Sequence, residues 1–245
     1  MVEDAFRAAP SRLAVRGMPD DREHARTTAS RGGAEERAGG GRARARDADP
    51  GPAPAQSVLH EAALSYLARG SATAATLARV LDRKVTTWAR RAERAQRDPD
   101  LLAADLVICR EAIAAIVTRF REVGLIDDAA YAASRARSLS RAGRSRRAIS
   151  AHLAAKGVDA ETVREALPAD ASVELAAALA FARKRRIGPY AREAADGDRA
   201  ARQKALAAMA RAGFGWSTCE RALGMDLEEA DERLAADRLG TSWGR

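Results

Sequence analysis

Apolar residues recur three or four positions apart through most of the chain beyond residue 58, which is the spacing of one face of an α-helix. The first such pattern predicts a helix over residues 58–69 that ends at Gly70. A second predicted helix follows, where Ser71 or Thr73 is placed to cap the backbone. The apolar positions of these two helices are Leu59, Ala63, Tyr66, Leu67, Leu77, Val80, Leu81, Val85 and Trp88.

The next segment, residues 89–103, is highly charged and contains Pro99. Because proline interrupts a helix interior, this segment is predicted to be an irregular helix followed by a loop. The helical pattern resumes near Leu106 and predicts a strongly amphipathic helix that ends at Gly124. Its apolar positions are Ile108, Ile113, Ile116, Val117, Phe120 and Val123.

Two adjacent aspartates mark the start of the following helix. Asp127 stands where an N-cap residue is expected, and Asp128 falls in the first turn, where the helix dipole favours negative charge. A carboxylate pair can also indicate acid–base catalysis or a metal site. The capping interpretation accounts for both residues without either.

The chain contains an internal repeat. When Gly157 is aligned with Gly213, 56 residues later, each copy is a helix, a turn of glycine and an apolar residue, and another helix. A weaker upstream copy matches Leu77, Leu81 and Lys84 to Ile149, Leu153 and Lys156. The other aligned pairs are Ile149 with Ala205, Leu153 with Met209, Val158 with Phe214, Val163 with Cys219, and Leu167 with Leu223. Units this small cannot bury their own apolar faces, so neighbours are expected to stack into an elongated, curved array.

Composition favours an all-α fold, because aromatic residues make up only 4% of the chain and alanine dominates the apolar residues. The first fifty or so residues contain few large apolar side chains and cannot bury enough surface to fold. The predicted organisation is an array of tandem three-helix repeats with a disordered tail. The boundaries are residues 1–55 for the Arg/Ala/Gly/Pro-rich tail, 56–123, 124–170 and 171–236 for the three repeats, and 237–245 for a flexible C-terminus.

No catalytic or cofactor-binding motif is recognisable. There is no Walker A sequence, no dinucleotide-binding glycine pattern after a strand and no nucleophile elbow. His24, His60 and His152 lack metal-ligand spacing, and Cys109 and Cys219 are interpreted as small core residues. The sequence therefore predicts a protein that is not an enzyme, with no cofactor and no metal. It also shows no membrane span and no secretory signal, so a cytoplasmic location is expected.

Positive charge is concentrated in the middle of the chain. The net charge is +8, and every ionisable charge between Ala129 and Val158 is positive. A second basic group follows near residues 183–186, with Arg192 close behind. Because equivalent residues of a repeat face the same side, the two groups are predicted to form one stripe that binds phosphates or rows of Asp and Glu. For each arginine, simple solvation is the alternative. The candidate binding residues are Arg137, Arg141, Arg144, Arg146, Arg147, Lys156, Arg183, Lys184, Arg185 and Arg186.

The order of residues from Gly124 to Val158 resembles the RecX family of recombinase regulators. That family's pattern has an aliphatic turn ending in two aspartates, an aromatic–alanine pair, a basic helix, a glycine turn and a Lys-Gly-apolar ending. The matching positions are Gly124, Leu125, Ile126, Asp127, Asp128, Tyr131, Ala132, Arg137, Gly143, Arg147, Ile149, Leu153, Lys156, Gly157 and Val158. The structural motif residues among them are Gly124, Leu125, Asp127, Asp128, Tyr131 and Gly157. Arg135 departs from the pattern, which makes Arg137 the better binding candidate.

The resemblance implies a monomeric regulator that lies in the groove of the RecA nucleoprotein filament and contacts RecA together with single-stranded and double-stranded DNA. Such a regulator inhibits strand exchange, ATP hydrolysis and coprotease action in recombination and the SOS response. Occupying the groove would exclude a second DNA or a repressor, and capping the growing end would favour disassembly.

Two other functions stay open on the residues alone. One is an independent DNA-binding protein that reads bases with a helix–turn–helix pair between Arg147 and Leu167. The segment DAETVREAL, its recognition helix, is acidic and would repel phosphates. The other is a helical scaffold whose arginines bind neither DNA nor RecA.

Overall fold

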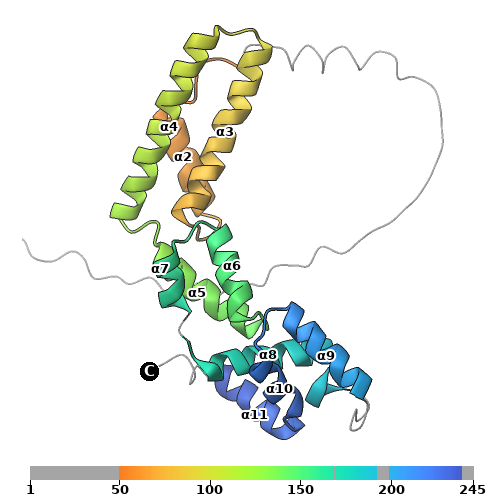
Figure 1. Ribbon diagram of the computed structural model, residues 1–245. Coiled ribbons are helices and arrows are strands. Elements are labelled where there is room, and N and C mark those ends of the chain that lie inside the picture. The colour runs from red at the N-terminus through yellow and green to blue at the C-terminus, as the bar shows by residue number, and fades with distance from the viewer. Residues whose placement is uncertain (1–49, 168, 192–198, 239–245) are drawn as a thin grey trace, which may run out of the picture. The chain divides into compact units, whose positions relative to one another are not determined.

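The computed structural model describes residues 50–167, 169–191 and 199–238, and these contain helices and no strand (Figure 1). The predicted all-α fold is therefore confirmed. The predicted tail over residues 1–49 and the last residues, 239–245, lie outside the described residues. The elements are α2 (Gln56–Leu67), α3 (Ala74–Arg94), α4 (Pro99–Glu122), α5 (Asp128–Arg141), α6 (Arg146–Ala155), α7 (Ala160–Ala166), α8 (Ala171–Arg185), the short 3₁₀-helix η1 (Gly188–Tyr190), α9 (Arg199–Arg211), α10 (Trp216–Gly224) and α11 (Leu227–Arg238).

Helices α2, α3 and α4 enclose one apolar core, and Figure 1 shows α3 and α4 as a long antiparallel pair. Ile108 and Val123 were predicted to belong to this core, but they are 62% and 47% exposed. Cys109, which is 1% exposed, faces the core instead of Ile108. One residue along a helix turns the side chain by about 100°, so Ile108 points away from the face on which Ile113, Ile116 and Phe120 are buried as predicted. The buried residues of the core are Leu59, Ala63, Leu77, Leu81, Val85, Cys109, Ile113, Ile116, Phe120 and Ile126.

The prediction of an irregular helix followed by a loop over residues 89–103 is only partly correct, because the non-helical stretch is limited to residues 95–98. Helix α3 continues to Arg94, and Pro99 begins α4 rather than interrupting a helix. Proline suits the first helical position because the N–H that it lacks would have no intrahelical partner there. Asp98 is the N-cap of α4, and its carboxylate accepts a hydrogen bond from the Asp100 N–H at 2.8 Å.

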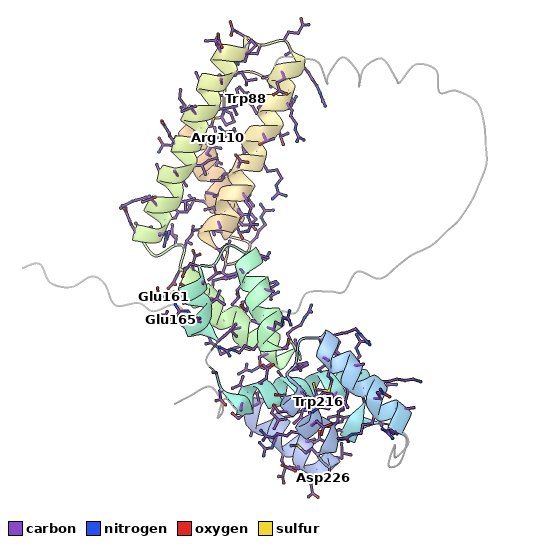
Figure 2. The ribbon with its side chains drawn as sticks, in the orientation of Figure 1. Trp88, Arg110, Glu161, Glu165, Trp216 and Asp226 are labelled. Atoms are coloured by element: carbon purple, nitrogen blue, oxygen red, sulfur yellow. The ribbon has the colours of Figure 1, made fainter. Side chains whose placement is uncertain are left out.

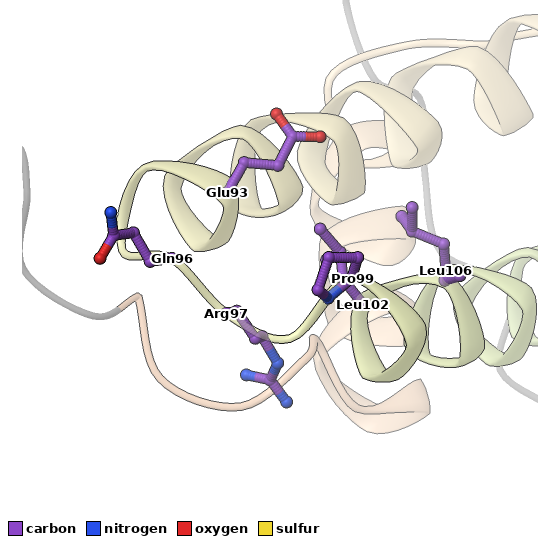
Figure 3. A pocket seen from close by; sticks show the side chains of 7 residues that line it. Glu93, Gln96, Arg97, Pro99, Leu102 and Leu106 are labelled. Carbon is purple, nitrogen blue, oxygen red and sulfur yellow. The ribbon is translucent and has the colours of Figure 1, made fainter.

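Residues 50–55, assigned to the tail from the sequence, instead contact α3 and α4. Trp88 donates its indole N–H to the carbonyl of Gly51 at 3.1 Å. Arg97 lies over the Trp88 ring at 5.4 Å and pairs with Asp105 at 2.8 Å. Figure 3 shows Arg97 beside a hollow of about 560 Å³ between the end of α3 and the start of α4. The guanidinium group of Arg97 thus contacts both the Trp88 ring and Asp105 at this turn, which gives the hollow a structural explanation.

The internal repeat around the two aligned glycines is confirmed. Helices α6 and α7 flank Gly157, α9 and α10 flank Gly213, and the two glycines have left-handed φ angles of 81° and 91°. All of the aligned apolar residues of this pair of repeats, from Ile149 with Ala205 to Leu167 with Leu223, are buried. The third group differs from the three-helix prediction because it contains a fourth helix, α11, which buries Ala230 and Leu234 in the same core as α8.

The upstream copy is only partly equivalent. Leu77 and Leu81 are fully buried, as are their counterparts in α6. However, α3 does not end where α6 ends. Val85 stands at the position of Gly157, and a β-branched residue strongly disfavours the left-handed conformation that a glycine turn needs. The helix therefore continues to Arg94.

Two equivalent hydrogen bonds link successive groups of helices. Thr73, the N-cap of α3, donates its hydroxyl to the carbonyl of Lys156 at 2.7 Å. Ser145, the N-cap of α6, donates its hydroxyl to the carbonyl of Ala212 at 2.6 Å. Both hydroxyl residues are 0% exposed, and both carbonyls belong to the residue before an aligned glycine. We call Thr73–Lys156 and Ser145–Ala212 the inter-repeat joints.

A carboxylate reinforces each inter-repeat joint. The backbone N–H of Ala74 donates to Asp128 at 2.9 Å, and the N–H of Arg146 donates to Glu174 at 3.0 Å. Asp128 thus has a second role besides the predicted one in the first turn of its helix. The aligned glycine is required as well, because a Cβ at Gly157 would clash with the Cβ of Ala75.

Candidate functional site

The motif residues of the second group mostly take the structural places that the sequence indicates. Asp127 is the N-cap of α5 and accepts a hydrogen bond from the Ala130 N–H at 2.8 Å. Tyr131 is half-buried against the core of this group. Leu125 is different, since it is 52% exposed while its neighbour Ile126 is 4% exposed and fills the core of the first group.

Helix α5 buries small residues on one side and exposes arginines on another. Ala132, Ala136 and Ser140 are buried and allow close packing of the neighbouring helices. Arg137 and Arg141 are one helical turn apart and both are exposed. The pair therefore forms one accessible patch of positive charge.

Arg135 lies on a different side of α5 from Arg137, as their spacing of two residues requires. Its Nε donates to Nε2 of His152 on α6 at 3.5 Å. Burial lowers the pKa of His152, and the positive charges of Arg135, Lys156 and Arg144 lower it further. His152 is therefore neutral at pH 7, because burial and the neighbouring positive charges disfavour its protonated form.

The two predicted basic groups adjoin at Phe181 of α8. A Cβ at Gly143 would lie 2.7 Å from the backbone nitrogen of Phe181, so the turn before Arg144 packs directly on α8. The guanidinium of Arg185 lies over the Phe181 ring at 5.6 Å. The residues of the second group are all exposed in the last turn and C-cap of α8, where the helix dipole favours positive charge. They are Arg183, Lys184, Arg185 and Arg186, whereas Arg192 lies outside the described residues.

Arg146 and Arg147 begin α6, and each contacts a residue further along the chain. The Nε of Arg146 donates to the carbonyl of Leu167 at 3.1 Å. A Cβ at Gly213 would lie 3.4 Å from the Cβ of Arg147, so the stem of this arginine packs over the glycine turn. Lys156 is the half-buried C-cap of α6, and its carbonyl takes part in an inter-repeat joint.

Arg146 and Arg147 also line a hollow of about 550 Å³ bordered by α6, α7, α8 and α10. Arg164 of α7 lines the same hollow. Arg164 is not among the binding residues predicted from the sequence, because it lies between two glutamates in a segment interpreted as acidic. Only the three-dimensional packing of α7 beside α6 brings it next to the other two arginines.

The carboxylates of Asp170 and Glu174 also line this hollow, and each accepts a hydrogen bond from a backbone N–H. Burial raises the pKa of Glu174, while the Arg146 N–H and the Arg146 charge oppose that shift. Hydrogen bonds from the Ser172 hydroxyl and N–H lower the pKa of Asp170, the N-cap of α8. Asp170 is therefore ionised at neutral pH and fixed at its helix terminus.

Helix α7 carries the negative charge that the sequence indicates. Glu161 and Glu165 are exposed and lie one turn apart, and Figure 2 shows them together on one side of α7. Asp159 caps the helix, and hydrogen bonds from Thr162 lower its pKa. A seven-residue helix with this charge is poorly suited to the major groove of DNA.

The described residues hold no group of three or more His, Cys, Asp or Glu side chains placed to bind a metal ion. Nor does the described part of the chain include a helix long and apolar enough to cross a bilayer. Cys109 and Cys219 are free, buried and members of different cores. Burial raises the pKa of both thiols, so neither is an activated nucleophile.

Comparison with known proteins decides the family. Residues 127–167, which include α5, α6 and α7, match the family model described as RecX, second three-helix domain. The chain is 36% identical over 168 residues to the regulatory protein RecX of Myxococcus xanthus, a match that covers 67% of this chain and 83% of that protein. The chain belongs to the RecX family.

A second RecX relative, the regulatory protein RecX of Agrobacterium fabrum, is 40% identical over 110 residues. That match covers 45% of this chain and 58% of the relative. No solved structure is significantly similar to the chain. Both RecX relatives are named as regulatory proteins, so the chain is a member of a family of regulatory proteins.

Proposed function

We propose that this RecX-family chain binds the RecA nucleoprotein filament and inhibits its strand exchange, ATP hydrolysis and coprotease activities in homologous recombination and the SOS response. Membership of the family is the observation that carries the proposal. A monomeric state and a cytoplasmic location are part of it. No catalytic role is included.

The exposed arginines support this function in physical terms. Arg137 and Arg141 are accessible on α5, and the turn that follows them packs on α8 next to Arg185. Guanidinium groups stay charged at all physiological pH values and bind phosphate or carboxylate through paired hydrogen bonds. A filament of protein and DNA offers both kinds of anion. We propose that the ten candidate basic residues together form its contact surface.

The alternative of an independent base-reading protein is less well supported. Its recognition helix would be α7, whose exposed Glu161 and Glu165 repel phosphates. The experiments below also distinguish it from the proposed function.

The test uses the full chain and the RecA protein of the same organism, with RecA ATPase on single-stranded DNA as the readout. The triple variant R137A/R141A/R147A is expected to inhibit at least tenfold more weakly than the wild type, since each lost charge-assisted contact removes roughly 1 kcal/mol or more. The charge-matched control R83A/R90A/R94A removes three exposed arginines of α3 and is expected to inhibit like the wild type.

Equal inhibition by the two triple variants would contradict the assignment of the surface. A wild-type chain that leaves RecA activity unchanged at every ratio would contradict the proposed function itself. Selective, salt-resistant protection of one duplex sequence would support the independent DNA-binding alternative.

A further inference from the structure

The exposure of Trp216 is not explained by the fold. It is the first residue of α10 and is 67% exposed, whereas Trp88 is 7% exposed. The aligned position in the preceding repeat is Ala160, the first residue of α7, so the repeat itself requires no aromatic residue here. Tryptophan is enriched at surfaces that bind a partner, because its ring offers a large apolar area and its N–H a polar contact.

The surroundings of Trp216 indicate the chemistry of that partner. Its neighbours Gly215 and Thr218 line the hollow of about 550 Å³ together with Arg147 and Arg164. In the described part of the chain, neither of these guanidinium groups has a hydrogen-bond or ion-pair partner. Two available cations therefore lie in the hollow, and Trp216 directly follows Gly215, one of the residues that line it.

The acidic residues of the hollow leave this positive charge available. Asp170 is fixed by the N–H and hydroxyl of Ser172, each at 2.7 Å. Glu174 accepts the Arg146 N–H at 3.0 Å. Both carboxylates thus already accept hydrogen bonds within α8 and at an inter-repeat joint, and neither forms an ion pair with Arg147 or Arg164 in the part of the chain that the structure describes.

We infer that Trp216 and this hollow form a contact site for single-stranded DNA, in which a base stacks on the indole while Arg147 and Arg164 bind the adjacent phosphate. The inference rests on the proposed function, because it assigns the strand-contacting part of the same basic surface. Stacking needs the face of an unpaired base, which duplex DNA does not offer. An aromatic residue beside a basic hollow is the arrangement that sequence-independent single-strand binding uses.

The test compares two labelled strands of equal length, an oligo(dT) and an abasic strand that has the phosphates but no bases. Binding of the full chain is followed by fluorescence anisotropy at several salt concentrations. W216L keeps an apolar side chain but removes the ring, and it is expected to weaken oligo(dT) binding at least ~5-fold with little change for the abasic strand. W216F is expected to retain most of the affinity.

R164A is expected to weaken both strands and to reduce the slope of log affinity against log salt by about 0.7, the value for one lost phosphate contact on a single strand. The matched controls lie in the same group of helices and remove an exposed apolar and an exposed basic side chain. They are L227A on α11 and R221A on α10, and both are expected to bind like the wild type.

Equal affinity of the wild type for the two strands, or wild-type oligo(dT) binding by W216L, would overturn the inference. So would a W216L defect confined to binding of RecA in the absence of DNA, which would mark a protein contact. The proposed function is judged separately, by whether the wild-type chain inhibits RecA ATPase. If W216L binds oligo(dT) like the wild type while the wild-type chain inhibits RecA ATPase, only the strand site is rejected. If W216L weakens oligo(dT) binding as expected but the wild-type chain does not inhibit RecA ATPase, only the filament-binding function is rejected.

Discussion

Replacing Ser145 by alanine tests the inter-repeat joint with almost no change in shape. The hydroxyl makes two hydrogen bonds, donating to the Ala212 carbonyl at 2.6 Å and accepting from the Ala148 N–H at 3.2 Å. The residue is 0% exposed, so water cannot simply replace the lost group. The substitution therefore removes a helix cap and an inter-repeat hydrogen bond together.

The expected loss follows from these two contacts. Removing a serine N-cap costs about 1 kcal/mol, and leaving the part-buried Ala212 carbonyl without its donor costs about 1–3 kcal/mol. The free energy of unfolding of Ser145→Ala should therefore fall by ~2–4 kcal/mol, a large part of the ~5–15 kcal/mol typical of folded domains. Thr73→Val, which removes the equivalent hydroxyl and keeps the side-chain volume, should cause a loss of similar size.

Urea unfolding followed by circular dichroism measures the effect, with the Trp fluorescence transition recorded in parallel. Ser138→Ala is the matched control, because Ser138 is exposed on α5 and should change stability by less than ~0.5 kcal/mol. If the midpoints of Ser145→Ala and Ser138→Ala coincide, the joint makes no net contribution to stability, and the reasoning from buried hydroxyls is refuted.

Three further predictions concern the turn glycines, the cysteines and the histidine. Gly157→Ala should lower the free energy of unfolding by more than ~2 kcal/mol in the same urea assay, because the φ of 81° disfavours a side chain and the new Cβ would clash with Ala75. Gly224→Ala is the control and should leave stability unchanged, because a Cβ there meets nothing within 4 Å. Cys109 and Cys219, both buried with raised thiol pKa values, should react with a thiol reagent only at the rate of unfolding, and rapid labelling of the native protein would contradict their placement. The pKa of His152 in the folded protein lies below its ordinary value, so the unfolded chain binds more protons, and the free energy of unfolding falls as pH drops through about 6.5 toward the folded pKa. His152→Gln should reduce that fall. NMR titration of the Arg135→Ala variant should show the pKa of His152 raised part of the way back to its ordinary value.

The sequence predicted the helices best where one apolar face repeats over several turns. Leu59, Leu77 and Leu81 are in the core as expected, and so are the aligned pairs around Gly157 and Gly213. The errors arose where a single local signal was ambiguous. Pro99 was interpreted as a helix breaker although proline also begins helices. Ile108 was counted in the apolar face of α4 although it is 62% exposed, whereas Cys109 beside it is buried, as predicted.

The sequence could not predict which basic residues gather in space. The charge run from Arg135 to Arg147 was visible, but Arg135 contacts His152, whereas Arg146 and Arg147 line a hollow with Arg164. Such groupings depend on how separate helices pack, and local periodicity contains no information about that. Trp216 went unnoticed for a similar reason, because a residue at the start of an amphipathic helix gives no sign of its exposure.

The inter-repeat joint connects stability with the presentation of the arginines. Ser145 caps α6, the next residue's N–H binds Glu174, and the stem of Arg147 packs over Gly213, so three consecutive residues fix the start of α6 to the following group. At the position aligned with Ser145 in the third group the chain has Ala201, which has no hydroxyl to form another such bond. In the third group α11 packs on α8, and Asp231 of α11 accepts a hydrogen bond from the Tyr190 hydroxyl at 3.0 Å. At this aligned position the two groups that bond to a following group have a hydroxyl residue, Thr73 or Ser145, and the third group has Ala201. The arginines beside Ser145 are therefore held at a joint between two groups of helices rather than at a free helix end.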